Sequence, residues 1–110
     1  MENIDKFDIV ICIGPEDISI IKKQIEYTKK NILGYRNIYI IPFDDKFTLD
    51  GCITIKESDF PFSKSTIENI LQSKIRNGWY LQQLLKFYST FVIKDLLPNY
   101  LELDADTFFL

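Results

Sequence analysis

One short stretch, residues 8–13 (DIVICI), restricts the fold of this chain more than any other. It is a continuous apolar run rich in β-branched residues, which is typical of a strand buried on both faces of a parallel sheet. Gly14 and Pro15 end the run, and a helical pattern follows over residues 16–33. A second β-branched run occupies residues 37–43. This strand-helix-strand order predicts a parallel βαβ unit.

The helical pattern has one apolar face. Its apolar positions recur at helical spacing, at Ile18, Ile21, Ile25 and Ile32. Thr28 fills the gap on that face. Pro15 suits the first helical position, and Gly34 is expected to end the helix.

Residues 47–55 leave two structures open. Asp50 and Gly51 form a favoured hairpin turn pair, and short β-branched runs flank them. We expect either a small hairpin or a loop that leads into a third strand.

Two helices are predicted in the second half of the chain. The segment 65–68 has capping-box spacing at the start of the first, and Asn77-Gly78 is expected to end it. The second runs over residues 79–93, with an apolar stripe of Leu81, Leu84, Leu85, Tyr88, Phe91 and Val92. A turn at residues 97–99 then leads into a strand that begins at Tyr100.

Composition excludes several classes of function. The net charge of -3 argues against general nucleic-acid binding. The absence of histidine excludes imidazole catalysis and His-ligated zinc. No apolar run approaches the ~18 residues of a membrane span, and the N-terminus lacks a signal-peptide pattern. Cys12 and Cys52 are expected to be reduced, buried, small hydrophobic residues. We therefore expect a cytoplasmic protein with no nucleic-acid partner and no membrane span.

Asp104 and Asp106 are the chemically distinctive residues. They lie two positions apart in an apolar run, and alternate residues of an extended strand point to the same side. Two carboxylates placed together repel and lose hydration unless a cation compensates. Mn²⁺ and Mg²⁺ favour such hard oxygen ligands. The alternative is a pair of acids at a solvated strand end.

Three of the predicted elements end at one edge. In doubly wound sheets, ligands bind beyond the carboxyl ends of the strands. Gly14, Asp44 and Asp104 each lie at or just past such an end, so we expect them along one rim.

Residues 79–86 (WYLQQLLK), the Leu-Leu-Pro turn at Pro98, and residues 100–106 (YLELDAD) resemble the central block of GT-A nucleotide-diphospho-sugar glycosyltransferases. They are similar to the family-8-like enzymes and to bacterial and viral relatives with a Trp-Tyr-x-Gln-Gln-x-x-Lys helix. Over residues 8–43 the resemblance is only topological. It implies an α/β fold with a partial doubly wound, mainly parallel sheet, the Rossmann-like nucleotide-binding half of the GT-A fold.

The resemblance also implies a metal site and a donor. Asp104 and Asp106 would hold Mn²⁺ or Mg²⁺ against the diphosphate of a nucleotide sugar, and the sugar would pass to an unknown acceptor. Catalytic residues stay unknown because the acceptor-binding half of these enzymes lies downstream of the motif. We expect residues 1–110 to form a single nucleotide-sugar-binding domain that is incomplete at its C-terminus.

Nucleotide contacts are implied after the first two strands. Ile13 and Gly14 would touch the base or ribose, and Asp44 is a candidate for the base. The alternatives are that Gly14 and Pro15 form only a tight turn and that Asp44 belongs to an ordinary loop.

The helix after Gly78 would supply a positively charged side chain to the site. Lys86 would lie near the diphosphate or donor sugar, although it projects away from the centre of the predicted stripe. The alternative is a solvated helix lysine. Trp79 is expected in the core, and one of Gln82 and Gln83 is expected to face inward.

Two other functions stay open. The first is a truncated, non-catalytic remnant that acts as a nucleotide-binding or interaction module. The second is a phospho-acceptor domain, which also clusters aspartates at strand ends. The second is disfavoured because it needs an acidic pair directly after the first strand, where this chain has Cys12-Ile13-Gly14.

Overall fold

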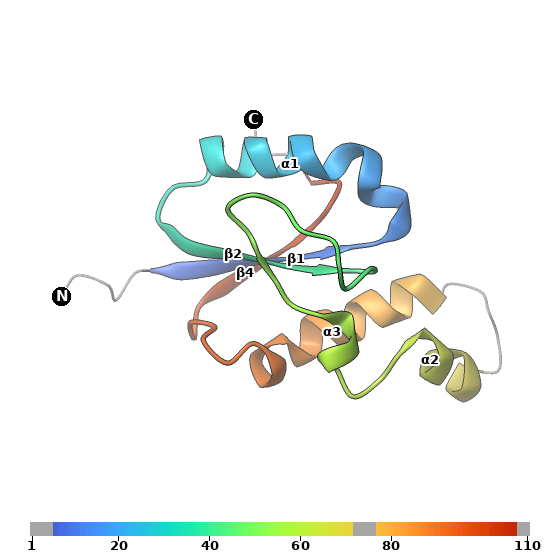
Figure 1. The fold of residues 1–110 in the computed structure, drawn as a ribbon. Helices are drawn as coiled ribbons and strands as arrows, with labels where there is room; N and C mark the ends of the chain where they lie inside the picture. The colour runs from blue at the N-terminus through green and yellow to red at the C-terminus, as the bar shows by residue number, and fades with distance from the viewer. Residues whose placement is uncertain (1–5, 72–76, 108–110) are drawn as a thin grey trace.

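The computed structural model of the protein describes residues 6–71 and 77–107, and it contains a sheet of four parallel strands in the order β3-β2-β1-β4. The strands are β1 (Phe7–Ile13), β2 (Tyr35–Pro42), β3 (Ile53–Thr54) and β4 (Tyr100–Asp104). Helices cover both faces of this sheet (Figure 1). The α/β class and the mainly parallel sheet predicted from the sequence are therefore confirmed.

One face of the sheet is covered by α1 (Ile18–Asn31), which follows a short 3₁₀ turn at Pro15–Asp17. Ile21 and Ile25 of α1 pack in a core with sheet residues Ile9, Ile11, Ile13, Ile38, Ile40, Leu103 and Ala105. The predicted stripe is wrong at its start, because Ile18 is 43% exposed. Gln24, a polar residue that the apolar pattern does not mark, is completely buried instead.

The opposite face carries α2 (Lys64–Leu71) and α3 (Asn77–Val92). The core there is formed by Val10, Cys12, Tyr39, Ile41, Phe60, Ile67, Leu81, Leu85 and Ile93. The predicted stripe of α3 is wrong at Tyr88 and Phe91, which are both exposed. Ser89 is buried instead, because its hydroxyl donates to the backbone carbonyl one turn earlier at 2.9 Å and so is not left unpaired.

Residues 47–55 do not form a hairpin. Asp50-Gly51 does turn the chain, with a glycine φ of 76°, but β3 then runs parallel to β2 and pairs Ile53 with Tyr39. A loop that leads into a third strand, the second structure expected, is therefore correct. The amine of Lys29 fixes this loop by donating to the Asp50 carbonyl at 2.8 Å.

Both helix boundaries near residues 63–78 differ from the prediction. The Ser63 hydroxyl accepts from the Thr66 backbone N–H at 3.4 Å, and the Thr66 hydroxyl accepts from the Ser63 N–H at 3.2 Å. This reciprocal cap lies two residues before the predicted segment 65–68. Residues 77 and 78, expected to end a helix, are the first residues of α3, since Asn and Gly also suit helix N-termini.

The amino end of the sheet is held by an ion pair between a buried carboxylate, Asp8, and an exposed arginine, Arg36. Asp8 is completely buried and accepts from Nε and Nη2 of Arg36 at 3.0 and 2.8 Å. It also accepts from the backbone N–H groups of Asn37 and Leu97 at 3.1 and 2.8 Å. Arg36 donates as well to the Asp95 carbonyl. One carboxylate thus ties β1 to the start of β2 and to the connection before β4.

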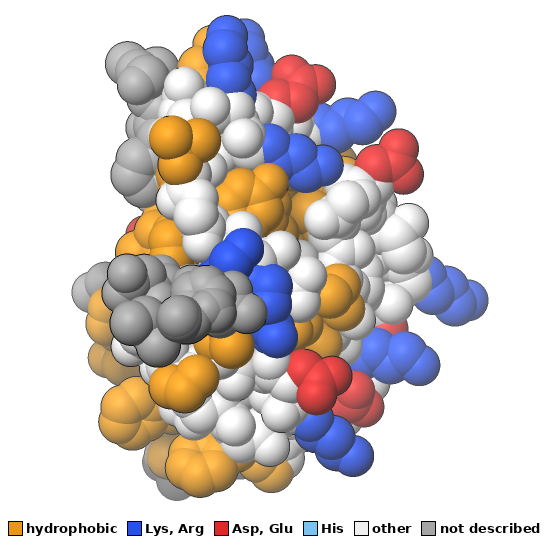
Figure 2. All heavy atoms as spheres, turned by 90° about the vertical axis from the view of Figure 1, so that its left-hand side faces the viewer, with side chains coloured by type: hydrophobic (Ala, Val, Ile, Leu, Met, Phe, Trp, Pro, Cys, Tyr) orange, Lys and Arg blue, Asp and Glu red, His pale blue; other side chains and the backbone are white. Residues whose placement is uncertain are grey.

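Figure 2 shows the side of the molecule from which the chain enters β1. Hydrophobic side chains gather at the lower left of this view, at the level of the layer that contains α3. Exposed hydrophobic residues of α3 are Trp79, Tyr80, Phe87, Tyr88 and Phe91. Within the described ranges, none of the helices is long and apolar enough to cross a membrane.

Candidate functional site

The carboxyl ends of the strands meet as the sequence predicts. Cys12 of β1 lies between Ile41 of β2 and Asp104 of β4 in the strand register. One residue further along, the Phe43 N–H donates to the Ile13 carbonyl at 2.9 Å. The loops after β1 and β2 and the first aspartate of the motif therefore share one edge of the sheet.

Asp104 ends β4, and Asp106 lies on the turn that follows it, so the two acids do not share one extended strand. Asp104 is the last residue of β4, and its carbonyl accepts from the Thr107 N–H at 3.0 Å. Ala105, between the two acids, is buried in the α1-side core. Both acidic residues are exposed. The turn thus buries its one apolar side chain and leaves both acids in solvent, where a cation has access to them.

Lys86 lies directly beside the motif. Its Nζ is 2.5 Å from Oδ1 of Asp104, and its side chain is only 18% exposed. The buried stripe of α3 passes through Leu85 and Ser89. The helix is therefore rotated about its axis relative to the prediction, and this rotation places Lys86 closer to β4. The lysine therefore stands at the level of the carboxyl edge.

The ammonium of Lys86 acts on two more groups. Burial raises the pKa of Glu102, and Lys86 opposes that shift, as does a 3.5 Å hydrogen bond from the Ser89 hydroxyl. Burial raises the pKa of the Cys12 thiol to about 12, again against the effect of Lys86. The Lys86 ammonium thus favours the charged form of two groups, Glu102 of β4 and Cys12 of β1, against the effect of burial.

The 3₁₀ turn after β1 adds acids to the same edge. Asp17 accepts from the Gly14 N–H at 2.8 Å. Its pKa is raised by burial first, and also by repulsion from Glu16, Asp106 and Asp104. Among the residues that the structure describes, no three His, Cys, Asp or Glu side chains are gathered closely enough to hold a metal ion. A cation bound here would need further ligands from water or substrate.

A pocket of about 440 Å³ adjoins this edge, between the sheet and α3. Ile13 and Gly14, both predicted site residues, line it together with Gln82. A Cβ on Gly14 would lie 3.1 Å from Oε1 of Glu16 and 3.3 Å from Nε2 of Gln82, so glycine suits this close approach. Gln82 is the inward-facing glutamine that the sequence predicts.

Trp79 lies on the wall of this pocket and not in the core. The residue is 48% exposed, and its ring makes an edge contact with Tyr80 at 5.0 Å. It stands at the start of α3, where the helix passes the pocket. The prediction of a core tryptophan is therefore wrong.

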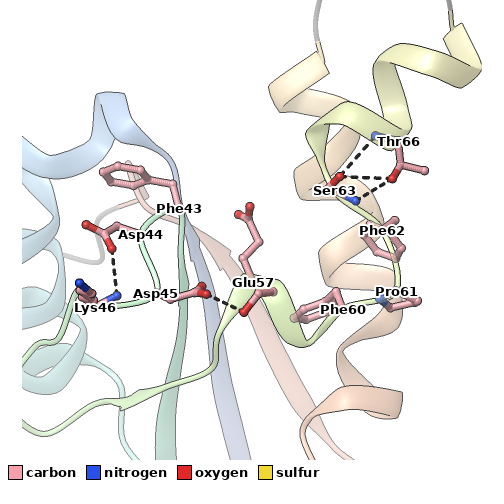
Figure 3. A pocket seen from close by; sticks show the side chains of 11 residues that line it. Phe43, Asp44, Asp45, Lys46, Glu57, Phe60, Pro61, Phe62, Ser63 and Thr66 are labelled. Atoms are coloured by element: carbon pink, nitrogen blue, oxygen red, sulfur yellow. Dashed lines mark hydrogen bonds between the residues drawn. The ribbon is translucent and has the colours of Figure 1, made fainter.

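A second hollow, of about 870 Å³, lies between the loop after β2 and the segment before α2 (Figure 3). Asp44, the predicted base contact, lines it and accepts from the Lys46 N–H at 2.9 Å. Asp45 accepts from the Ser58 hydroxyl at 2.6 Å. Phe43 and Glu57 line both hollows, which therefore adjoin. Together they form a groove along the carboxyl edge.

Glu57 and Lys64 are among the charged residues of this groove that were not predicted. Glu57 follows β3, and its pKa is raised by burial and by Asp45 against the effect of Lys64. Lys64, the first residue of α2, lines the smaller pocket beside it. Glu57 was missed because a hairpin was also expected at residues 47–55. Only a parallel third strand places the residues that follow it at this edge of the sheet.

Comparisons with known proteins give no match for this chain among protein-family models, curated proteins or solved structures. The site is therefore defined by its own chemistry. A lysine on a carboxylate, two further acids nearby and a groove with apolar walls lie at one edge of the sheet. Such a set suits a divalent cation together with a ligand that is anionic at one end and apolar at the other.

Proposed function

We propose that this chain is the nucleotide-binding half of a GT-A glycosyltransferase. It binds a nucleotide diphosphate sugar with Mn²⁺ or Mg²⁺, for transfer of the sugar to an acceptor. The observation that carries this proposal is the contact between Lys86 and Asp104, at 2.5 Å. It pairs a cation from α3 with the first acid of an Asp-x-Asp motif at the carboxyl edge of a parallel sheet, where such folds bind ligands.

The residues present suit a hard divalent cation. Carboxylate oxygens of Asp104 and Asp106 are exposed on one turn. Mn²⁺ and Mg²⁺ are often held by one or two carboxylates that water and substrate phosphates complete. Asp104 and Asp106 repel the carboxylate of Asp17, so a bound cation would also reduce this repulsion. The ion would supply Lewis-acid stabilisation of the leaving diphosphate.

Lys86 has the position to exchange partners when a diphosphate binds. In the structure its ammonium pairs with the carboxylate of Asp104. A bound cation would take over that carboxylate, and Lys86 would then be free to donate to a phosphate oxygen as a point charge. Its four-carbon stem lets the amine make this change without movement of α3.

The nucleoside and sugar would occupy the groove. Phe43 and the aromatic residues before α2 supply apolar walls to the larger hollow (Figure 3), and Asp44 and Glu57 supply hydrogen-bond acceptors for a base or for hydroxyl groups. Gly14 lets a ligand approach the backbone at the end of β1. Binding and orientation are thus assigned to this chain, whereas the acceptor and the catalytic residues are not.

Titration calorimetry with UDP and GDP, each with and without Mn²⁺, tests the proposal. We expect the parent protein to bind one nucleotide more tightly with Mn²⁺ than without it. This gain should be lost in Asp104→Asn and Asp106→Asn, which keep the side-chain size and remove the charge. Asp59→Asn is the matched control, because Asp59 is exposed and lies outside both hollows. Equal affinity with and without metal would overturn the proposed metal dependence.

The second candidate is a non-catalytic interaction module. One specific observation favours it: Phe87 and Phe91 are each 79% exposed on the outer side of α3. Exposed apolar patches of this kind mark contact surfaces. Sedimentation velocity tests it, with concentration-dependent association in the parent that Phe87→Ser abolishes. Absence of nucleotide binding together with such association would favour this candidate over the first.

A further inference from the structure

Gln24 joins α1 to the chain directly after the aspartate motif. The residue is completely buried in the face that α1 turns toward the sheet. Its Nε2 donates to the Thr107 carbonyl at 2.9 Å, across 83 positions of sequence. This assignment of the amide is the only favourable one, since the reverse orientation would set one oxygen against another. Gln24 is therefore a direct contact between the first helix and the candidate metal turn.

The bond holds the turn at its far end. Asp104 is fixed at the near end, because it pairs with Cys12 in the sheet. Thr107 closes the turn through its N–H to the Asp104 carbonyl at 3.0 Å, and its own carbonyl is held by Gln24. Asp106 lies between these two anchors. The distance between the two carboxylates thus depends on both.

The amide is a poor choice for stability alone. Its Oε1 is buried without a hydrogen-bond partner in the part of the chain that the structure describes, and so is Oγ1 of Thr28 one turn later. An unpaired buried polar atom costs free energy that an apolar side chain of the same shape would not. Buried polar atoms are normally hydrogen-bonded, and exceptions to this rule are expected at functional sites.

We propose that Gln24 is a positioning residue, which fixes the Asp104–Thr107 turn so that Asp104 and Asp106 can bind one divalent cation. This inference rests on the proposed function for its metal-binding part only. The fixed turn itself is a property of the metal-free chain. The two parts can therefore be tested separately.

The experiment compares Gln24→Met with Thr28→Val. Each change removes a buried polar group from the same face of α1 at nearly constant volume, but only the first removes the bond to Thr107. Hydrogen exchange of the Thr107 amide, followed by NMR in the metal-free proteins, is the first readout. We expect exchange at least tenfold faster in Gln24→Met than in the parent, and a rate close to that of the parent in Thr28→Val.

The second readout is Mn²⁺ affinity, measured by electron paramagnetic resonance with the metal alone. We expect it to fall about tenfold in Gln24→Met, the usual scale for loss of a group that orients metal ligands, and to hold in Thr28→Val. Urea unfolding verifies that both variants fold. Unchanged Thr107 exchange in folded Gln24→Met, or equal losses of Mn²⁺ affinity in both variants, would overturn the inference. A parent that binds no Mn²⁺ would contradict the proposed function, and the exchange rates would still decide the role of Gln24.

Discussion

Nζ of Lys86 and Oδ1 of Asp104 lie 2.5 Å apart, although the two residues belong to different elements, α3 and β4. The lysine side chain is mostly covered, whereas that of Asp104 is 57% exposed. The contact therefore holds the Lys86 ammonium at the edge of the sheet and leaves the Asp104 carboxylate open to solvent. A ligand can reach the acid without any rearrangement of the backbone.

Lys86→Met is expected to weaken binding of UDP or GDP in the presence of Mn²⁺ by about 1–3 kcal/mol, the usual size of a charge-assisted contact. The free energy of unfolding should change by less than about 1 kcal/mol, because the partner acid is exposed. Calorimetry and urea unfolding measure the two quantities. Lys23→Met, an exposed lysine of α1, is the control. A loss below about 0.5 kcal/mol in both variants would show that Lys86 is an ordinary surface lysine.

Asp106→Asn is expected to lower the pKa of Asp17 toward its ordinary value. Burial contributes most to the raised pKa of Asp17, and Asp106 is one of the charges that add to it. The change keeps the side-chain size and removes that repulsion. Carboxyl ¹³C titration by NMR measures the pKa in both proteins. An unchanged or higher pKa of Asp17 would mean that the two acids do not interact.

Glu102→Gln is expected to raise the free energy of unfolding at pH 7, by less than about 1 kcal/mol because the residue is only partly buried. The pKa of Glu102 is raised above its ordinary 4.5, chiefly by burial. The folded chain therefore holds this proton more strongly than the unfolded chain, so that the parent loses stability as pH rises from 4.5 through the folded-state pKa. The advantage of the variant should disappear below pH 4.5. Urea unfolding at pH 4 and pH 7 measures it, with exposed Glu26→Gln as the control.

The strands β1, β2 and β4 and the helix α1 could be predicted because their signals are local, whereas the turn at Asp106 was expected to be extended backbone. Residues 9–13 are apolar without interruption, Pro15 and Gly34 bracket the helix, and a strand must end near Asp104. Each of these features depends on near neighbours in sequence. The carboxyl-edge rule then places the ends of parallel strands together.

The missed features depend on contacts between distant residues. Whether β3 pairs parallel to β2 cannot be read from Asp50-Gly51, which turns the chain in either case. Ser89 is buried only because its hydroxyl finds a backbone carbonyl, and this small change of face brings Lys86 to the motif. Gln24 is likewise buried against a carbonyl 83 positions away. Polar residues that are buried within the core escape any pattern that counts apolar residues.

The two cysteines are expected to differ in reactivity. Burial raises the pKa of Cys12 from 9.0 to about 12 and leaves the residue 2% exposed. At pH 8 its thiolate fraction is thus far below that of an ordinary thiol. Cys52 has a raised pKa too but is only half-buried. Iodoacetamide followed by mass spectrometry should label Cys52 first, and Cys12 only after denaturant is added. Equal labelling of both in the native protein would contradict the buried position of Cys12.

Asp8→Ala is expected to lower the free energy of unfolding by about 2–4 kcal/mol. The change leaves the N–H groups of Asn37 and Leu97 without their acceptor, and each buried donor left unpaired costs about 1–3 kcal/mol. Urea unfolding measures the loss, and exposed Asp59→Ala is the control. Equal stability of the two variants would show that the Asp8 carboxylate does not tie the strands together.

The pairing of β1 with β4 sets the order in which the molecule can assemble. Residues 7–13 and 100–104 are neighbours in the sheet but lie far apart along the chain, so closing this contact costs more loop entropy than pairing β1 with β2. Chains with many such long-range contacts fold slowly. During synthesis the first βαβ unit leaves the ribosome long before β4 does. The edge that gathers Gly14, Lys86 and Asp104 is therefore complete only when β4 has paired with β1, and no N-terminal segment that lacks β4 can carry it.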